Sequence, residues 1–175
     1  MTGNTAIDST TNLVKEKINE LNAVKAEAVK VIRENFKDIF MDFFSKYPDV
    51  AEASWLQYTP YFADGDPCVF GVGDLAFITK GDMNPDGTPK SEDYYWGESP
   101  RGYYWGNVNG KYEKVMGLEQ DEIDAGYTLE MIDDFEKLRD AFSSISSDIF
   151  LDLFGDHARV VVNRGGVSVE EFDHD

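Results

Sequence analysis

The sequence has few of the residues from which most chemical sites are built. Cys68 is the only cysteine, and His157 and His174 are the only histidines, so an internal disulfide and a cysteine-rich zinc site are excluded. We expect Cys68 to lie in an apolar strand and behave as a small hydrophobic residue. Signature motifs of phosphate-binding loops, dinucleotide folds, zinc proteases and serine hydrolases do not occur. The sequence therefore predicts a protein that is not an enzyme and needs no cofactor.

Basic residues and long apolar runs are also scarce. Lysine and arginine total 16 against 34 aspartates and glutamates, which gives a formal net charge of −18. Such a field repels nucleic acid and anionic lipid and attracts basic surfaces. No apolar run has the length of a membrane span, and residues 1–5 lack the features of a signal peptide. We expect a soluble cytoplasmic protein that binds neither nucleic acid nor membrane directly, and whose partner is a protein with a basic surface.

A long helix is predicted near the N-terminus. Residues 10–47 contain neither glycine nor proline, apolar residues recur every three or four positions, and Pro48 prevents continuation. Residues 1–9 are small and polar and are expected to fray. The N-terminal half of the helix has only a narrow apolar seam between charged residues. We expect this half either to project and pair with a second copy as a homodimer, or to pack on the second helix of its own domain.

The remaining patterns complete a single α+β domain over 1–175. Thr128 is a good N-cap for a second long helix that runs to Gly155, and two β-rich runs around residues 163–166 predict a C-terminal β-hairpin. Residues 111–120 are predicted to be weakly structured and 121–126 to form a turn. The expected architecture is an antiparallel sheet covered on one side by two long helices.

The least ordinary stretch is the aromatic run 55–70, which we interpret as two strands around a turn at 64–67. Its aromatic residues are either core and rim residues of the sheet or a binding face. Asp64 and Asp66 also suggest a paired-carboxylate site, which would make the protein an enzyme, although an Asp-Gly-Asp turn needs such residues for its own backbone. The candidate binding residues of this stretch are Trp55, Gln57, Tyr58, Tyr61, Asp64 and Asp66.

Two aromatic triplets, 94–96 and 103–105, flank a glycine-rich segment and are predicted to form the arms of a loop or short hairpin. Aromatic rings beside Arg101 are suited to stacking a nucleobase. The alternatives are a site that sequesters a nucleotide or other small molecule, and a thin core under the loop. The candidate residues are Tyr95, Trp96, Arg101, Tyr104 and Trp105.

The loop 82–93 has some features of a calcium-binding loop. Asp82, Asn84 and Asp86 occupy the first, third and fifth positions, and a glycine occupies the sixth. The twelfth position is Asp93 rather than glutamate, Lys90 stands at the ninth, and the flanks are not helical. We therefore treat the loop as a weak metal candidate, with a polar Asp-Gly turn as the simpler interpretation.

The stretch 55–70, together with the closing residues 167–175, resembles a group of small acidic proteins of tailed bacteriophages and some bacteria. The resemblance covers about a seventh of the chain and implies a phage-type origin. It implies no particular activity, but small acidic phage proteins often bind and block a host protein. The leading expectation is a non-enzymatic modulator of a host protein, such as an inhibitor of a defence factor or a mimic of nucleic-acid charge.

Overall fold

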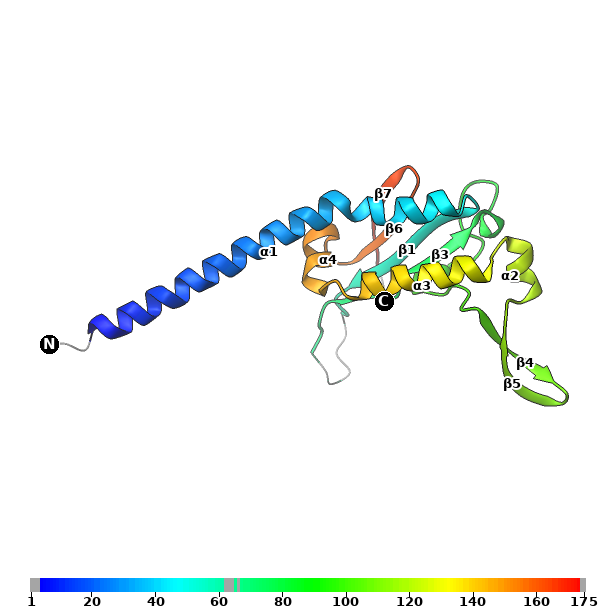
Figure 1. Cartoon of the computed structure of the whole chain (residues 1–175), viewed down its shortest axis with the longest axis horizontal. Coiled ribbons are helices and arrows are strands. Elements are labelled where there is room, and N and C mark those ends of the chain that lie inside the picture. The colour runs from blue at the N-terminus through cyan, green and yellow to red at the C-terminus, as the bar shows by residue number, and fades with distance from the viewer. Residues whose placement is uncertain (1–3, 62–64, 66, 174–175) are drawn as a thin grey trace. The chain divides into compact units, whose positions relative to one another are not determined.

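The computed structural model describes residues 4–61, 65 and 67–173, with side chains from residue 9 onward. It shows an α+β protein with an antiparallel sheet, helices and a C-terminal pair of strands, as predicted (Figure 1). The chain divides into two compact units, Met1–Phe36 and Lys37–Asp175.

Helix α1 spans Asn4–Lys46. It therefore begins before Thr10, and the part of the predicted frayed segment that the structure describes is helical. The C-terminal end is where the sequence placed it, because Pro48 cannot continue a helix. The last turns of α1 belong to the second unit, where Phe40, Phe43 and Phe44 are buried.

The main sheet is antiparallel and is built around strand β1. Strand β1 lies between β6 on one side and the two short strands β2 and β3 on the other, and β7 pairs with β6 at the sheet edge. The β6–β7 hairpin confirms the predicted C-terminal hairpin. The strands are β1 (Val50–Tyr58), β2 (Gly71–Val72), β3 (Ala76–Thr79), β6 (Ala158–Asn163) and β7 (Gly166–Glu171).

The prediction that Cys68 lies in an apolar strand was wrong. Residues 67–70 are not in a strand, and Cys68 is exposed rather than buried. Within the apolar run 68–78, pairing with β1 occurs at the two short strands β2 and β3. Between these strands, Gly73 N donates to Leu56 O at 2.7 Å. Only part of this apolar run is therefore a buried strand, namely β3, in which every residue is buried.

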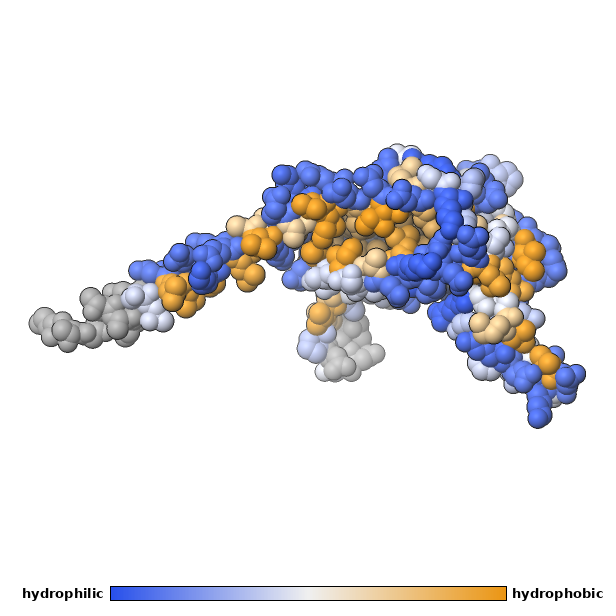
Figure 2. Space-filling view, in the orientation of Figure 1, coloured by the Kyte–Doolittle hydropathy of each residue, from blue (hydrophilic) through white to orange (hydrophobic). Residues whose placement is uncertain are grey.

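Trp55 lies at the centre of the core. Its indole is 0% exposed and contacts Phe40 of α1, with ring centroids 6.4 Å apart. Three further rings meet it edge-on at 5.0–5.9 Å: Phe142, Phe150 and Phe154. Figure 2 shows apolar side chains gathered between the C-terminal part of α1 and helix α3 (Leu129–Ser143). One face of the sheet is thus packed against helices through aromatic contacts.

The predicted second long helix is two helices. Helix α3 starts at the predicted N-cap, where Thr128 Oγ1 accepts from Met131 N at 3.2 Å. It ends at Ser143, and helix α4 covers Ser147–Phe154, with Gly155 as its C-cap. The break falls in a serine-rich segment, where Ser144 Oγ donates to Ala141 O at 2.6 Å. Serine side chains compete for backbone hydrogen bonds in this way, and apolar periodicity alone did not reveal it.

The segment between β3 and α3 is more ordered than predicted. Residues 93–96 form a short 3-10 helix, η2, while 103–105 begin a strand, so the two aromatic triplets are not arms of one hairpin. A separate hairpin pairs β4 (Tyr103–Val108) with β5 (Lys111–Met116). Its turn, Asn109-Gly110, has positive φ at both residues, as a tight hairpin requires. The expected turn at 121–126 is helix α2, Gln120–Ala125.

Arg164 ties the C-terminal hairpin to the end of α1. Its guanidinium donates to the carbonyl of Phe44 at 2.8 Å, of Tyr47 at 3.1 Å and of Pro48 at 3.0 Å, and also to that of Val50 at 2.6 Å. The last carbonyls of a helix have no partner within the helix. Arg164 therefore caps α1 from a distant part of the chain.

We expect Trp55→Ala to lower the free energy of unfolding by about 3–5 kcal/mol, because it leaves a cavity among four aromatic rings. Trp105→Ala is the matched control, since Trp105 is 55% exposed on the β4–β5 hairpin. It should cost less than about 1 kcal/mol. Urea denaturation followed by circular dichroism measures both, and equal losses would contradict the central position of Trp55.

Candidate functional site

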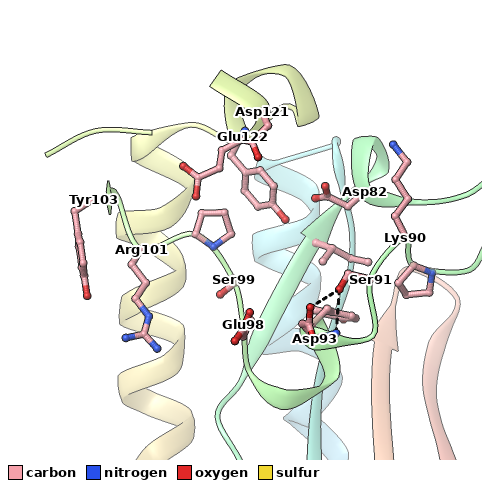
Figure 3. A pocket seen from close by; sticks show the side chains of 15 residues that line it. Asp82, Lys90, Ser91, Asp93, Glu98, Ser99, Arg101, Tyr103, Asp121 and Glu122 are labelled. Carbon is pink, nitrogen blue, oxygen red and sulfur yellow. Dashed lines mark hydrogen bonds between the residues drawn. The ribbon is translucent and has the colours of Figure 1, made fainter. Parts of the chain in front are cut away.

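The second unit contains a pocket of about 540 Å³ whose walls come from four segments of the chain (Figure 3). These segments are the end of β3 with the 3-10 helix η1 (Lys80–Asp82), residues 89–94, residues 98–103, and helix α2 with Tyr127, two positions after it. The lining residues are Ile78, Asp82, Pro89, Lys90, Ser91, Asp93, Tyr94, Glu98, Ser99, Pro100, Arg101, Tyr103, Asp121, Glu122 and Tyr127.

Two walls of the pocket are held together by a close backbone contact. A Cβ atom at Gly81 would lie 2.6 Å from Ala125 Cα, so only glycine allows η1 to approach the end of α2. Thr79 Oγ1 donates to the Ala125 carbonyl at the same contact. This contact fixes Asp82, which follows Gly81, relative to the acidic residues of α2.

Helix α2 brings two carboxylates to the pocket. Glu122 accepts a hydrogen bond from Glu119 N at 2.7 Å, as the N3 residue of a capping box. Burial raises the pKa of Glu122, and the neighbouring carboxylates of Glu119 and Asp121 add to this increase. Asp121 is exposed and labelled beside Glu122 in Figure 3. The field at this end of the pocket is therefore strongly negative.

Carboxylates outnumber cationic groups in the pocket. Its five acidic residues face only Lys90 and Arg101. Lys90 Nζ already donates to the Gly81 carbonyl, and hydrogen bonding to Tyr103 raises the pKa of Arg101. The acidic residues are Asp82, Asp93, Glu98, Asp121 and Glu122.

Three tyrosines also line this acidic pocket. Tyr94 is 3% exposed and Tyr127 is 5% exposed, and burial raises the pKa of both hydroxyls, so they remain neutral. Tyr103 is half-buried, and the ammonium of Lys114 lies 3.6 Å from its ring centroid. Carboxylates are suited to an ammonium or guanidinium group, which pairs with them through charge-assisted hydrogen bonds. The rings of Tyr94 and Tyr127 add little accessible surface because they are buried, and Lys114 already lies over the ring of Tyr103.

The side chains of the weak calcium-loop candidate do not gather at one place, because some line the pocket and others bond within the turn 84–88. Asp86 accepts from Thr88 N at 3.0 Å and from Thr88 Oγ1 at 2.6 Å, and Asn84 donates to Thr88 Oγ1 at 3.1 Å. The two bonds from Thr88 lower the pKa of Asp86, and together these contacts make the segment a polar turn. Asp82 and Asp93 line the pocket instead. No cluster of metal-binding side chains occurs among the described residues.

The aromatic run 55–61 contributes mainly to the core. Trp55 and Gln57 are both 0% exposed, so neither lies on a surface where a partner could reach it. Tyr58 is half-buried against Phe172, and the exposed ring of Tyr61 stacks on His157 with centroids 4.5 Å apart. The other predicted site residues of this stretch, Asp64 and Asp66, lie outside the described residues.

Each aromatic triplet brings one ring to the pocket that Arg101 lines, Tyr94 or Tyr103, but the predicted aromatic residues lie elsewhere. Trp96 meets Phe172 edge-on at 5.5 Å, and the Tyr95 ring lies 4.1 Å from the guanidinium carbon of Arg159. Trp105 stacks instead on Tyr112 across the β4–β5 hairpin, at 6.1 Å. Tyr104, on the same strand, is half-buried. Of these five predicted residues, only Arg101 lines the pocket.

Sequence reasoning missed the acidic wall of the pocket. Asp121 and Glu122 fell in a segment interpreted as a turn, and Glu98 and Tyr127 were not singled out. A signal was present, since four of the six residues 119–124 are acidic. Such a cluster suits the first turn of a helix, where the helix dipole favours negative charge.

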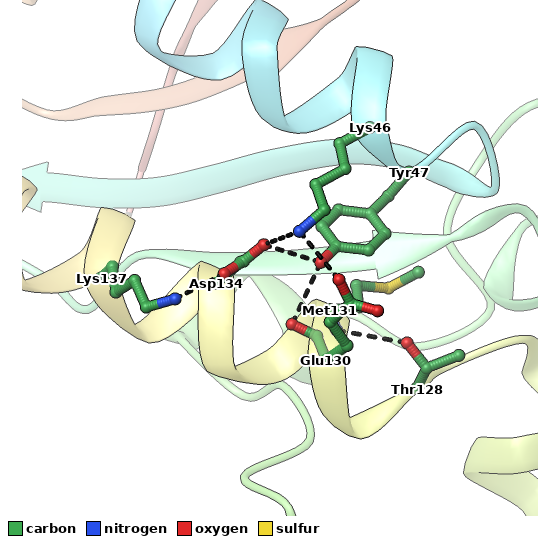
Figure 4. Close-up of polar contacts among 7 residues, drawn as sticks. All are labelled: Lys46, Tyr47, Thr128, Glu130, Met131, Asp134 and Lys137. Carbon is green, nitrogen blue, oxygen red and sulfur yellow. Dashed lines mark hydrogen bonds and ion pairs between the residues drawn. The ribbon is translucent and has the colours of Figure 1, made fainter.

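A second polar cluster joins α1 to α3 (Figure 4). Lys46 Nζ lies 2.6 Å from Asp134 Oδ2 and 2.9 Å from Glu130 Oε1, and the Tyr47 hydroxyl donates to Asp134 at 2.7 Å. Lys137 reaches the other oxygen of Asp134 at 2.6 Å. The two lysines lower the pKa of Asp134, and Asp134 raises that of Lys46. The two positive and two negative side chains of this cluster neutralise one another, so we interpret it as an ion-pair network that links α1 to α3 rather than as a binding site.

The sheet face opposite Trp55 buries a carboxylate. Glu52 is 9% exposed beside Ser54, and Tyr94 of η2 packs on the same face against Ala76 and Ile78. Burial raises the pKa of Glu52, and Glu170 adds to this increase. Ionisation of Glu52 is therefore less favourable in the folded protein than in the unfolded chain.

We expect Glu52→Gln to stabilise the protein at pH 7. The pKa of Glu52 is about 4.3 in the unfolded chain and higher in the folded protein. The wild-type protein therefore loses stability as the pH rises from the first pKa through the second. Glutamine does not ionise, so its advantage should shrink towards pH 4. Urea denaturation at a series of pH values measures this. The control is Glu113→Gln on the exposed face of β5, and a pH-independent difference for Glu52→Gln would contradict the assignment.

The chain matches no known protein family, no curated protein and no solved structure. Within the part of the chain that the structure describes, no helix is both long enough and apolar enough to cross a membrane.

Proposed function

We propose that the protein is a non-enzymatic interaction protein that binds the basic surface of a partner protein, with a lysine or arginine side chain of the partner entering the pocket. The observation that carries this proposal is the pocket lining, in which five carboxylates and three tyrosines face two cationic groups. A basic side chain gains ion pairs with the carboxylates of the pocket. A phosphate group would meet mainly like charge, which disfavours the alternative of a nucleotide-sequestering protein.

The position of the net charge supports the same conclusion. Residues 1–36 contain five acidic and five basic residues and are neutral overall. The remaining 29 acidic and 11 basic residues all lie in Lys37–Asp175, so the unit that holds the pocket carries the entire charge of −18. Such a field speeds the encounter with a basic partner and weakens with salt.

The resemblance to small acidic phage proteins suggests that the partner is a host protein. On this proposal the protein modulates its target in the host cytoplasm by occupying a basic site that otherwise binds a phosphate-rich molecule. The pocket then supplies the anchoring contact, and the surrounding charge supplies the attraction over longer distances.

The pocket can be tested with an oligolysine peptide as the probe. The variant Glu98→Gln/Asp121→Asn removes two lining carboxylates, and the control Asp38→Asn/Asp42→Asn removes two exposed carboxylates of α1. Both variants have the same net charge. We expect about a tenfold loss of affinity in the pocket variant, or roughly 1.4 kcal/mol, and little change in the control. Isothermal titration calorimetry measures both, and equal losses would show that only the overall charge matters.

The partner can be sought by affinity capture from bacterial lysate at low and at high salt. We expect one dominant basic protein that is retained at low salt, released at high salt, and lost with the Glu98→Gln/Asp121→Asn variant. Mass spectrometry identifies it. If thermal-shift screening instead found stabilisation by nucleotides that Arg101→Gln abolished, the proposal would be replaced by the nucleotide-binding alternative.

A further inference from the structure

The first unit exposes a seam of large aliphatic side chains along helix α1. Their exposed fractions run from 47 to 68%, and Figure 2 shows apolar residues along this part of the helix. Full burial of one such side chain stabilises a structure by about 1.5–3 kcal/mol. A helix on its own is marginally stable in water, because most helical stability in proteins comes from packing of the apolar face. The seam residues are Leu13, Val14, Ile18, Leu21, Val24 and Val31.

The spacing of the seam fits a heptad repeat. With Val14 at the first position of a heptad, Leu21 and Ala28 occupy the same position in the next two, and Val24 and Val31 fall at the fourth position. Leu13 and Ile18 then occupy a seventh and a fifth position, on either side of these core positions. The repeat is short, about two and a half heptads, so it predicts a weak association.

Lys17 is the one charged residue at a core position of this repeat. Its ammonium lies 2.7 Å from a carboxylate oxygen of Glu20 on the same helix. The long lysine stem can remain in the seam while the charge is held at its edge. A single polar core position costs stability but fixes the register in which two helices align.

The charges beside the seam discriminate between partner orientations. In a parallel pair of these helices, Glu20 of one chain faces Lys25 of the other, and Leu13 faces Ile18. In an antiparallel pair, Glu20 faces Glu27, which is repulsive. From this complementarity we propose that the α1 seam is a dimer interface and that its occupant is the same seam of a second copy, in parallel orientation.

The charge balance of the chain agrees with this choice. The seam lies in the neutral segment 1–36, so the helices themselves do not repel. In a parallel pair, the second units of both chains follow the same end of the paired helices, and each unit has a net charge of −18. The two units therefore repel each other, and salt screens this repulsion beyond about 8 Å at physiological ionic strength. The dimer should therefore strengthen with salt, whereas binding of a basic partner should weaken. The inference does not depend on the proposed function.

Sedimentation velocity of the full chain tests the interface. We expect a concentration-dependent dimer for the wild-type chain and a monomer for Leu21→Glu, which places a carboxylate in the seam. Asn19→Glu, on the opposite side of the helix, is the matched control and should remain dimeric. A wild-type chain that stays monomeric at 100 mM salt or above, on the order of physiological ionic strength, would overturn the proposal, as would a Leu21→Glu variant that dimerises like the control.

A charge swap tests the orientation without altering the apolar residues. Lys25→Glu should weaken the dimer about tenfold or less, since such pairs are exposed. Glu20→Lys also removes the intrahelical partner of Lys17, so the Glu20→Lys/Lys25→Glu variant is compared with Glu20→Lys alone and should dimerise more strongly than it. This gain is expected only for parallel helices. Circular dichroism checks that each variant keeps its helix content, and a double variant that dimerises no better than Glu20→Lys would overturn the parallel orientation.

Disulfide trapping gives an independent measurement. In a Cys68→Ser background, which removes the single exposed cysteine, Val14→Cys should form an interchain disulfide on oxidation. In an antiparallel dimer Val14 would lie near Val31 of the other chain, so the two cysteines would be about 25 Å apart. Non-reducing electrophoresis reads the result, and absence of the crosslink in a chain that dimerises would exclude parallel alignment.

Discussion

The rest of the second unit depends on the burial of one indole with its N–H satisfied. Trp55 Nε1 donates to Gln57 Oε1 at 3.0 Å, two residues along the same face of β1. The amide of Gln57 in turn donates to the carbonyls of Phe150 and Gly155. An unpaired polar group in this core would cost about 1–3 kcal/mol. This chain of hydrogen bonds therefore fixes where α4 ends on the sheet, while the ring of Trp55 holds α1, α3 and α4 together.

That constraint explains why β1 is buried on both faces and why the pocket lies where it does. One face of β1 packs on the helices through Trp55, and the other is covered by η2 through Tyr94. Strand β3, paired with β1, leads directly into η1 and Asp82. The pocket wall is thus an extension of the core, whereas the carboxylates that line it come from loops and from α2. Rigid support with charged loops is a common arrangement for a binding site.

The sequence predicted those features that depend on local chemistry. Thr128 caps α3, Gly155 ends α4 and the turn around Arg164 joins β6 to β7, because capping and turn geometry are set by a few adjacent residues. Features that depend on distant contacts were missed. The exposure of Cys68 depends on which part of an apolar run pairs with β1, and the pocket depends on contact between Gly81 and Ala125, 44 positions apart. Neither leaves a periodic signal.

The separation of charge along the chain gives the two proposed interactions opposite physical characters. Association through the α1 seam is apolar, occurs in a neutral segment and is opposed by the charge of the second unit. Binding at the pocket is electrostatic and is driven by that same charge. Because the same charge opposes the proposed dimer and attracts the basic partner, a bound partner that neutralises this charge would also weaken the repulsion between the two copies. A dimer would also present two pockets to such a partner. A partner with two basic sites would then bind more tightly than either pocket alone allows.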